Sequence, residues 1–438
     1  MKTKIFLLIF FFKALGIFAQ TYSYPANWTI ENCIQYAKEN NISINSLRLS
    51  KSAAEQDLLQ AKDAKYPNLN GTVSQGIFAV NGSSGLQLNG APSQSIGANS
   101  SMTLYHANYI KNNEISKNLT VQMSDLSVKE AENNITLTIT QAFLNILMAQ
   151  ENIVSLENVL KTTQTQLKQG EQFYSAGTIS KLNYLQIQAQ VAQDEYNLVS
   201  AQNTLRTNIV NLKQILQLPS SYDFQITKPV DITVDENLKA LADVQNTAQN
   251  ERPEIKYGEL NVENSNTNLK MARSSIQPTL SLVGNISTNY ANGNGNYFTQ
   301  LGNNFYLPVG LSLGIPIYNN RIYKTEIEKS KIAIQQANLD LLNTKTVLNQ
   351  QIEQSYISLQ NSLSQYDSAL KQMNINKESY DIVNAQMKIG SIDYVQLQQQ
   401  RLLYIQAIQN YLQAKYAAVL NKQIYEFYAG NPITLSRL

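Results

Sequence analysis

The chain has 438 residues, of which 43% are hydrophobic and 15% charged, and its formal net charge is +2. Such a nearly neutral chain lacks the electrostatic footprint of a nucleic-acid-binding protein, so no nucleic-acid partner is expected. The only cysteine, Cys33, excludes an intrachain disulfide, and the only histidine, His106, disfavours metal sites and histidine-based acid–base chemistry. Neither a cofactor nor a metal is expected.

Residues 1–19 are predicted to be a secretory signal peptide. Lys2 and Lys4 precede the apolar run 5–12, and residues 17–19 offer a small-residue cleavage site. This run is too short for a membrane span, which needs roughly 20 residues. No later continuous apolar stretch is long enough to be a membrane helix, so a chain that crosses a membrane would have to do so with strands closed into a barrel.

Residues 28–65 are predicted to be a helix rich in Ala, Leu, Gln, Glu and Lys. Tyr66-Pro67 should end it, because proline cannot supply the helical hydrogen bond and restricts the residue before it. Strands are predicted at 69–80 and 95–105, with the residues 81–95 as the loop between them. The apolar face of the second strand contains Ile96, Ala98, Met102 and Leu104.

The same order recurs in the second half. A helix is predicted at 237–276, before Pro278, followed by strands at about 280–287 and 305–315 and an Asn/Gly-rich turn at 291–304. An apolar face opposite a small or polar face fits either a half-buried sheet or a lipid-facing barrel wall. Strand lengths of roughly 10–12 residues favour the barrel, as do tyrosines at the strand–helix junctions. These tyrosines are Tyr105, Tyr109, Tyr318 and Tyr323.

Residues 105–217 and 318–430 are predicted to be two copies of one long helical hairpin. At an offset of 213, Tyr105 matches Tyr318 and Gly177 matches Gly390. The long helix of the first copy would span roughly 105 Å. Apolar or small residues recur in steps of four and three, as in a coiled-coil seam, although an ordinary amphipathic bundle would also fit. The seam positions are Ile135, Ile139, Ala142, Ile146, Ala149, Ile153, Leu156 and Leu160, then Leu348, Ile352, Ser355, Leu359, Ser362, Tyr366, Ala369 and Met373.

We therefore interpret residues 20–217 as a first structural repeat and 238–438 as a second repeat with a C-terminal segment. Residues 218–237 are predicted to be a short strand-bearing insertion at the equator. Four strands cannot close a barrel, which needs about eight, and an open sheet in lipid would leave unpaired edges. Self-association is therefore expected.

The pattern resembles the TolC-like outer membrane efflux protein family (the outer membrane factors) over essentially the whole mature chain. The resemblance is carried by 28–34 (WTIENCI), 61–67 (AKDAKYP), 252–255 (RPEI), 272–278 (ARSSIQP) and 314–320 (GIPIYNN), and by the two hairpin turns around Gly177 and Gly390.

The resemblance implies an α+β membrane protein. Each homotrimer would form a 12-stranded outer-membrane barrel continuous with a periplasmic α-helical barrel. Such proteins are passive exit ducts of tripartite efflux or secretion systems, and their partners are outer-membrane lipid, a periplasmic adaptor and an inner-membrane transporter.

The family uses the hairpin turns to form the periplasmic aperture and to meet the adaptor. The resemblance therefore implies adaptor docking at Gly177, Thr178 and Ile179 and at Gly390, Ser391 and Ile392. At the aperture this chain departs from the family pattern, since Asn183, Gln396, Ile392 and Met387 replace the expected Asp, Asp, Arg and Tyr. We expect a tip closed by packing and amide hydrogen bonds, with Lys388 nearby. Asp393 is either an acidic pore ring or a helix N-cap.

Two alternatives are weighed against the duct. A secreted structural coiled-coil protein, such as a stalk or surface-layer component, would share the hairpins but not the alternating strands with junction tyrosines. An enzyme is disfavoured, because the sequence has no Gly-rich phosphate loop, metal-spacing cluster or nucleophile elbow.

Overall fold

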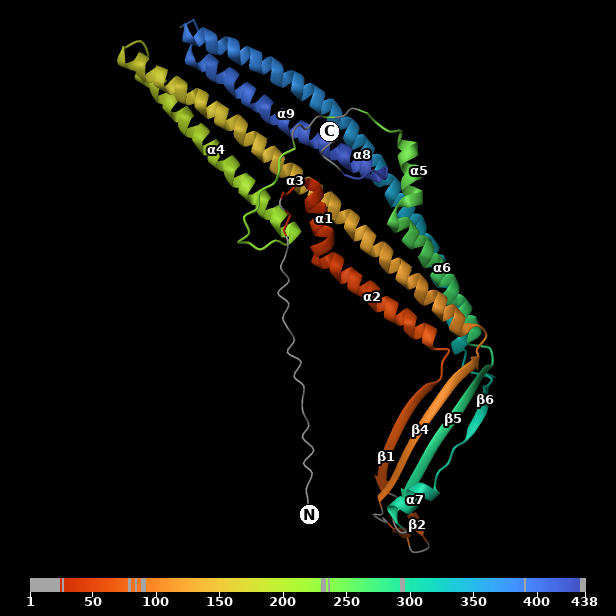
Figure 1. Cartoon of the computed structure of the whole chain (residues 1–438). Coiled ribbons are helices and arrows are strands. Elements are labelled where there is room, and N and C mark those ends of the chain that lie inside the picture. Colours follow the sequence, from red (N-terminus) through yellow and green to blue (C-terminus); the bar gives the residue numbers. More distant parts are fainter. Residues whose placement is uncertain are drawn as a thin grey trace, which may run out of the picture.

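The computed structural model describes residues 24–433 except 26, 78–79, 83–84, 88–91, 230–233, 235–236, 292–295 and 390. The molecule is elongated: a sheet lies at one end, and two helical hairpins extend to the other (Figure 1). The predicted signal peptide, residues 1–19, lies outside the described residues. None of the described helices is both long and apolar enough to cross a membrane.

Each half of the chain has the same order of main elements, with a small hairpin between the two strands of the first half and a short helix between those of the second. The first half contains α1 (Ile30–Asn40), α2 (Ile42–Asp63), β1 (Asn68–Ile77), the small hairpin β2 (Val80–Gly82) and β3 (Gly85–Gln87), β4 (Pro92–Tyr105), α3 (Tyr109–Ser175) and α4 (Lys181–Leu216). The second contains α5 (Leu241–Glu251), α6 (Pro253–Ser274), β5 (Thr279–Ala291), α7 (Tyr297–Asn303), β6 (Val309–Gly314), α8 (Ile322–Lys388) and α9 (Tyr394–Tyr428). The predicted two-fold repeat is thus confirmed.

The long hairpins are built on seams that the sequence predicted. α3 and α8 have 67 residues each, which is roughly 100 Å of helix at 1.5 Å per residue. Ile139 and Ile146 in α3, and Ile352 and Leu359 in α8, are fully buried. The other seam positions are buried or half-buried. α4 packs on α3, and α9 packs on α8. The buried seam residues thus lie in the helices that form the two hairpins.

Five predicted segments differ in the structure. The segment 28–65 is two helices, because Asn41 leaves α1 in an extended conformation and its side chain caps α2. The segment 237–276 also breaks, at Arg252, because Pro253 occupies the first turn of α6. The predicted turn 291–304 contains α7, and the predicted strand 305–315 shortens to β6. The predicted loop 81–95 contains β3 and the start of β4.

The sheet is antiparallel in the order β1-β4-β5-β6. Its register keeps the alternating faces aligned: Met102 of β4 lies opposite Leu282 of β5, and Leu282 lies opposite Leu311 of β6. β1 and β6 are the edges of this sheet. Leu311 and its neighbours Val309 and Leu313 are exposed.

Both strand-to-helix junctions use left-handed residues that are not glycine. Ala107 and Asn108 have φ of 41° and 64°, and Asn320 and Arg321 have φ of 50° and 68°. The first junction is held by Ser274, whose Oγ donates to the Ala107 carbonyl at 2.8 Å. His106 stacks on Tyr109 with ring centroids 4.7 Å apart. It therefore lies between the strand β4 and the helix α3.

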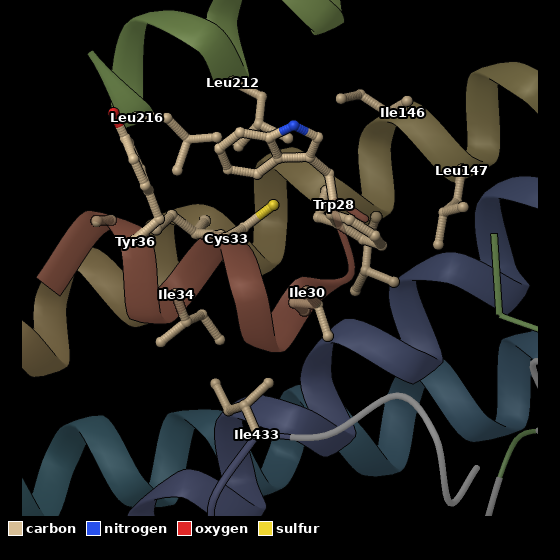
Figure 2. Packing of buried hydrophobic residues seen from close by; sticks show 14 of the residues in the cluster. Trp28, Ile30, Cys33, Ile34, Tyr36, Ile146, Leu147, Leu212, Leu216 and Ile433 are labelled. Carbon is tan, nitrogen blue, oxygen red and sulfur yellow. The ribbon is translucent and has the colours of Figure 1, made fainter. Parts of the chain in front are cut away.

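The largest core cluster joins α1 to α3 and α4 (Figure 2). Cys33 is fully buried there, and burial, with a smaller effect of Glu31, raises the pKa of its thiol to about 12. Trp28 donates from Nε1 to the Tyr222 hydroxyl at 3.2 Å, and its backbone forms a parallel bridge with Ile226. The described part of 218–237 thus contains an isolated bridge to Trp28 and no named strand, and its Leu218 and Phe224 are buried in this cluster.

Candidate hairpin-tip site

The first hairpin turn is a compact helix C-terminus. Gly177 adopts φ +72°, the left-handed conformation that glycine tolerates best. The Thr178 amide and hydroxyl both bond the Phe173 carbonyl at 2.8 Å. Ser180 then caps α4 by accepting from the Asn183 amide at 3.2 Å. Thr178 is exposed and Ile179 half-buried, so the turn presents a hydroxyl beside an apolar side chain.

The second turn repeats this geometry, although Gly390 itself lies outside the described residues. The Ser391 amide and hydroxyl bond the Gln386 carbonyl at 3.0 and 3.1 Å. Asp393 caps α9 by accepting from the Gln396 amide at 2.9 Å. Asp393 is therefore an N-cap, and its side chain is exposed.

The two tips share one small cavity with about 50 Å³ of space for water. Asn183 and Ile179 of the first hairpin line it together with Met387 and Lys388 of the second. Four of the residues singled out from the sequence thus lie around a common space. Its remaining walls are mostly apolar or amide side chains: Gln166, Gln169, Gly170, Phe173, Ile187, Asn384, Tyr394 and Leu397.

Amide and hydroxyl groups connect the hairpins beside this cavity. Gln166 of α3 donates from Nε2 to Asn384 at 3.2 Å and to the Tyr380 hydroxyl at 3.5 Å, both on α8. Burial raises the pKa of Tyr380, so it stays protonated at neutral pH. Burial also raises the pKa of Tyr394, at the start of α9, to about 12. The contact therefore contains neutral phenols and amides.

The strongest link was not predicted from the sequence. Arg401 of α9 forms an ion pair with Asp194 of α4, and their side chains are only 2% and 3% exposed. Thr163 of α3 donates to Asp194 at 2.7 Å, and Gln190 donates to it at 3.0 Å. Asp194 is thus fully engaged, whereas Nη1 of Arg401 has no hydrogen-bond partner among the described residues. The node ties the first hairpin to the second.

No sequence pattern could have paired these charges, because Asp194 and Arg401 are separated by 207 positions. A second, less buried link lies nearer the equator. Glu151 of α3 accepts from Lys415 at 3.0 Å and from the Tyr416 hydroxyl at 2.7 Å, both on α9. Burial acts to raise the pKa of Glu151, but these two hydrogen bonds and the Lys415 charge together lower it.

Within the described residues, no group of three or more His, Cys, Asp and Glu side chains is placed to hold a metal ion. The charged node is occupied by its own partners, and the tips offer exposed polar turns around an apolar hollow.

Fold and tips together define a subunit of a channel with long hairpins. The chain matches the outer membrane efflux protein family over residues 33–217 and 244–424, and it belongs to that family. It is 26% identical to the outer membrane protein TolC of Salmonella enteritidis over 152 residues. That alignment spans 33% of this chain and 31% of TolC, or about a third of either protein.

Solved channels share the fold over nearly the whole length. CusC matches with a TM-score of 0.79 at 16% identity, covering 94% of both chains. The Campylobacter jejuni CmeC outer membrane channel matches with a TM-score of 0.74 at 17% identity, covering 91% of this chain and 85% of CmeC. Membership of this family places the protein in the outer membrane with a large periplasmic part.

Proposed function

We propose that the protein is the outer-membrane exit duct of a tripartite efflux or secretion system. Three copies would enclose the duct, the sheets forming its membrane part and the hairpins its periplasmic part. A periplasmic adaptor would meet the tips and connect them to an inner-membrane transporter that supplies the energy. Family membership supports this function over a secreted structural stalk.

The observation that carries the proposal is a pair of edges that one copy cannot cover. β1 and β6 end the sheet on opposite sides. Beside them, α2 and α4 pack on α3 at one edge, and α8 packs on α6 and α9 at the other. Both helical edges expose apolar residues at several positions: Leu49, Leu182, Tyr196 and Val199 on one side, and Leu339, Leu342, Ile375 and Ile382 on the other. Backbone groups at the edges of a sheet in lipid cost several kcal/mol each when unpaired, so further copies should cover them.

The tips are suited to docking because they lie at the far end of both hairpins (Figure 1). Thr178 and Ser391 are exposed, and each hydroxyl is fixed by the helix terminus behind it. Ile179 and Ile392 are half-buried beside them. We expect an adaptor to contact these four residues together with Gly177 and Gly390.

We further infer that the Asp194–Arg401 node holds the duct shut above its tips. Asn183, Met387 and Lys388 would narrow the opening, whereas Gln396 and Asp393 would lie at the entry to α9. The family pattern has charged residues at the aperture. In this chain, the buried Asp194–Arg401 pair between the hairpins would take over their role.

Cysteine-directed crosslinking from Thr178→Cys and from Ser391→Cys in cells, followed by identification of the captured protein, tests the docking role. Thr346→Cys is the control, since Thr346 is exposed on the same helix as the second tip but roughly 60 Å away from it. Capture of a periplasmic adaptor by both tip variants and not by the control is expected. Capture of no periplasmic protein would count against docking at the tips.

A further inference from the structure

The two halves of the chain superimpose in register with two offsets. The elements α1 to β1 correspond to α5 to β5 at an offset of 211 residues, as the starts of α2 at Ile42 and α6 at Pro253 illustrate. The elements from β4 to α4 correspond to β6 to α9 at an offset of 213, as the starts of α3 and α8 illustrate. The strand pairs obey both offsets at once: Asn68 opposite Ser101 becomes Thr279 opposite Gly314.

Side-chain contacts obey the same offsets. Arg48 of α2 pairs with Glu132 of α3 at 2.8 Å. The corresponding residues of the second half, Glu259 of α6 and Lys345 of α8, also pair, at 3.5 Å, with the charges exchanged. A contact in one half therefore locates its counterpart in the other, even where the residue types differ.

One contact has no counterpart inside the chain. Within the subunit, the first half meets the second through β4 on β5, through α3 on α6 and, along the hairpins, through α3 on α9. The corresponding surfaces are β6 and α8 of the second half and β1, α2 and α4 of the first, which form the two uncovered edges. The occupant of each edge must present the other edge, and a second copy of this chain does so.

We propose, on the basis of the homotrimer proposed above, that adjacent copies repeat the contact between the two halves position for position. β6 of one copy then pairs with β1 of the next so that Ser312 lies opposite Ser74. In the helices, Lys329 of α8 faces Asp57 of α2. The strand register follows from Asn99 opposite Asn285 in the β4–β5 pair. It also sets Leu313 opposite Val73, the counterparts of Ser100 and Gly284.

The sheet faces provide an independent check on this register. Val73 lies opposite Ile96 on the apolar face of the β1–β4 pair, and Leu313 lies opposite Leu280 on the apolar face of β5 and β6. The proposed register keeps Val73 and Leu313 on one continuous face. A slip of one residue in either direction would place Leu313 opposite Thr72 or Ser74, on the wrong face.

The helix contact follows from Ser116, which is buried on α3 against α6. Its hydroxyl lies 2.7 Å from Oδ1 of Asn264 and 3.2 Å from Oδ1 of Asn268. The offsets convert Ser116 to Lys329 and Asn268 to Asp57. A neutral contact within the subunit thus becomes an ionic contact between copies. Asp57 accepts from Lys117 of its own subunit at 2.7 Å, and Lys329 of the next copy would be its second cation.

Disulfide trapping in the full-length protein tests the register. Ser287 exchanges two hydrogen bonds with Tyr306, and Asn285 donates to the Pro308 carbonyl. Asn285 therefore bonds towards β6, so its pair with Asn99 is the closer, non-hydrogen-bonded kind with Cα atoms about 4.5 Å apart. Ser74→Cys with Ser312→Cys reproduces that pair, at a separation that a disulfide can bridge. The native Cys33 is fully buried and does not compete.

The matched control is Thr72→Cys with Ser312→Cys, which shifts one partner by two residues on the same face to a diagonal separation of roughly 7–8 Å. After oxidation in outer membranes, the first pair should give covalent trimers on non-reducing gels at least roughly tenfold faster than the control. Faster trapping by the control, or no trapping by either in a protein of trimeric mass, would overturn the register and leave the homotrimer intact. A monomeric mass for the unmodified protein would overturn both.

A charge-reversal series tests the helix contact. Lys329→Glu should lower the temperature at which trimers dissociate in detergent, and Lys329→Glu with Asp57→Lys should recover at least part of the loss. Lys331→Glu is the control, because Lys331 pairs with Glu328 of its own helix. If Lys329→Glu and Lys331→Glu have the same effect, or if the double variant is worse than Lys329→Glu alone, Lys329 does not face Asp57.

Discussion

Replacement of Arg401 by Met should loosen the two hairpins from each other. The variant leaves the Asp194 carboxylate in a site where its side chain is 3% exposed. Removal of one member of a buried ion pair costs about 3–5 kcal/mol, because the remaining charge is uncompensated. Asp194 keeps its hydrogen bonds from Thr163 and Gln190, so we expect a value near the lower end, about 3 kcal/mol.

Since each 1.36 kcal/mol is a factor of ten, arrangements with separated hairpins should be favoured by about two orders of magnitude. Planar-bilayer recordings of the purified protein should show higher conductance or more frequent opening, and thermal unfolding should begin at a lower temperature. Lys371→Met is the control, because Lys371 and Asp367 form an exposed ion pair on α8. Exposed pairs are worth about 0–1 kcal/mol.

A double variant separates the buried charge from the packing. Asp194→Leu with Arg401→Met removes both charges, and an apolar replacement of a whole buried pair is often neutral or stabilising. Thr163 keeps its bond to the Val159 carbonyl in this variant. We expect most of the stability to return. If Arg401→Met matches Lys371→Met in conductance and in unfolding, the node does not hold the hairpins together.

Three further outcomes concern the tips and the equatorial link. Gly177→Ala should destabilise the first turn by about 1 kcal/mol, because φ of Gly177 is +72°, although no atom would contact the added carbon. The melting temperature should fall, and an unchanged value would contradict this. Asp393→Asn keeps an N-cap of equal strength, so any change in channel selectivity reflects the lost charge. We expect a weaker cation preference in single-channel recordings. An unchanged preference would show that Asp393 does not line the pore. Glu151 has a lowered pKa, so its contribution to stability is present above its usual pKa of about 4.5 and is lost as the pH falls through the lower folded value. The difference in melting temperature between Glu151→Gln and the unmodified protein should therefore shrink on acidification, and a constant difference would show that ionisation of Glu151 does not matter.

The parts of the fold that were predictable depend on local patterns. The seam at Ile139 and Ile352 repeats along each helix, so its spacing alone identifies it. Pro253 lies inside the predicted helix 237–276 and marks the break by itself. The composition on both sides of Pro253 is typical of a helix, which favours one continuous helix. α7 follows residues with loop chemistry, and its helix depends on the cap provided by Asn296.

The candidate site was predictable only at the turns that end one helix and begin the next. Thr178 and Ser391 could be located because they follow glycines between two helical segments. The Asp194–Arg401 node could not, since each residue is one charge on a long polar helix and the two meet only when separate hairpins pack. Residues that act within one helix leave a periodic signal, whereas a contact between distant helices leaves none.

The ion pair between α2 and α3 and its counterpart between α6 and α8 have exchanged charges, and this exchange bears on how the chain folds. The halves are alike enough that α2 could take the place of α6 on α8, or α6 the place of α2 on α3, during folding. The first mispairing would place Arg48 beside Lys345, and the second would place Glu259 beside Glu132. Both combinations are repulsive, whereas both native ones are attractive at 2.8 and 3.5 Å. The polarity of the ion pair in each half thus favours correct over crossed assembly of two halves with the same fold.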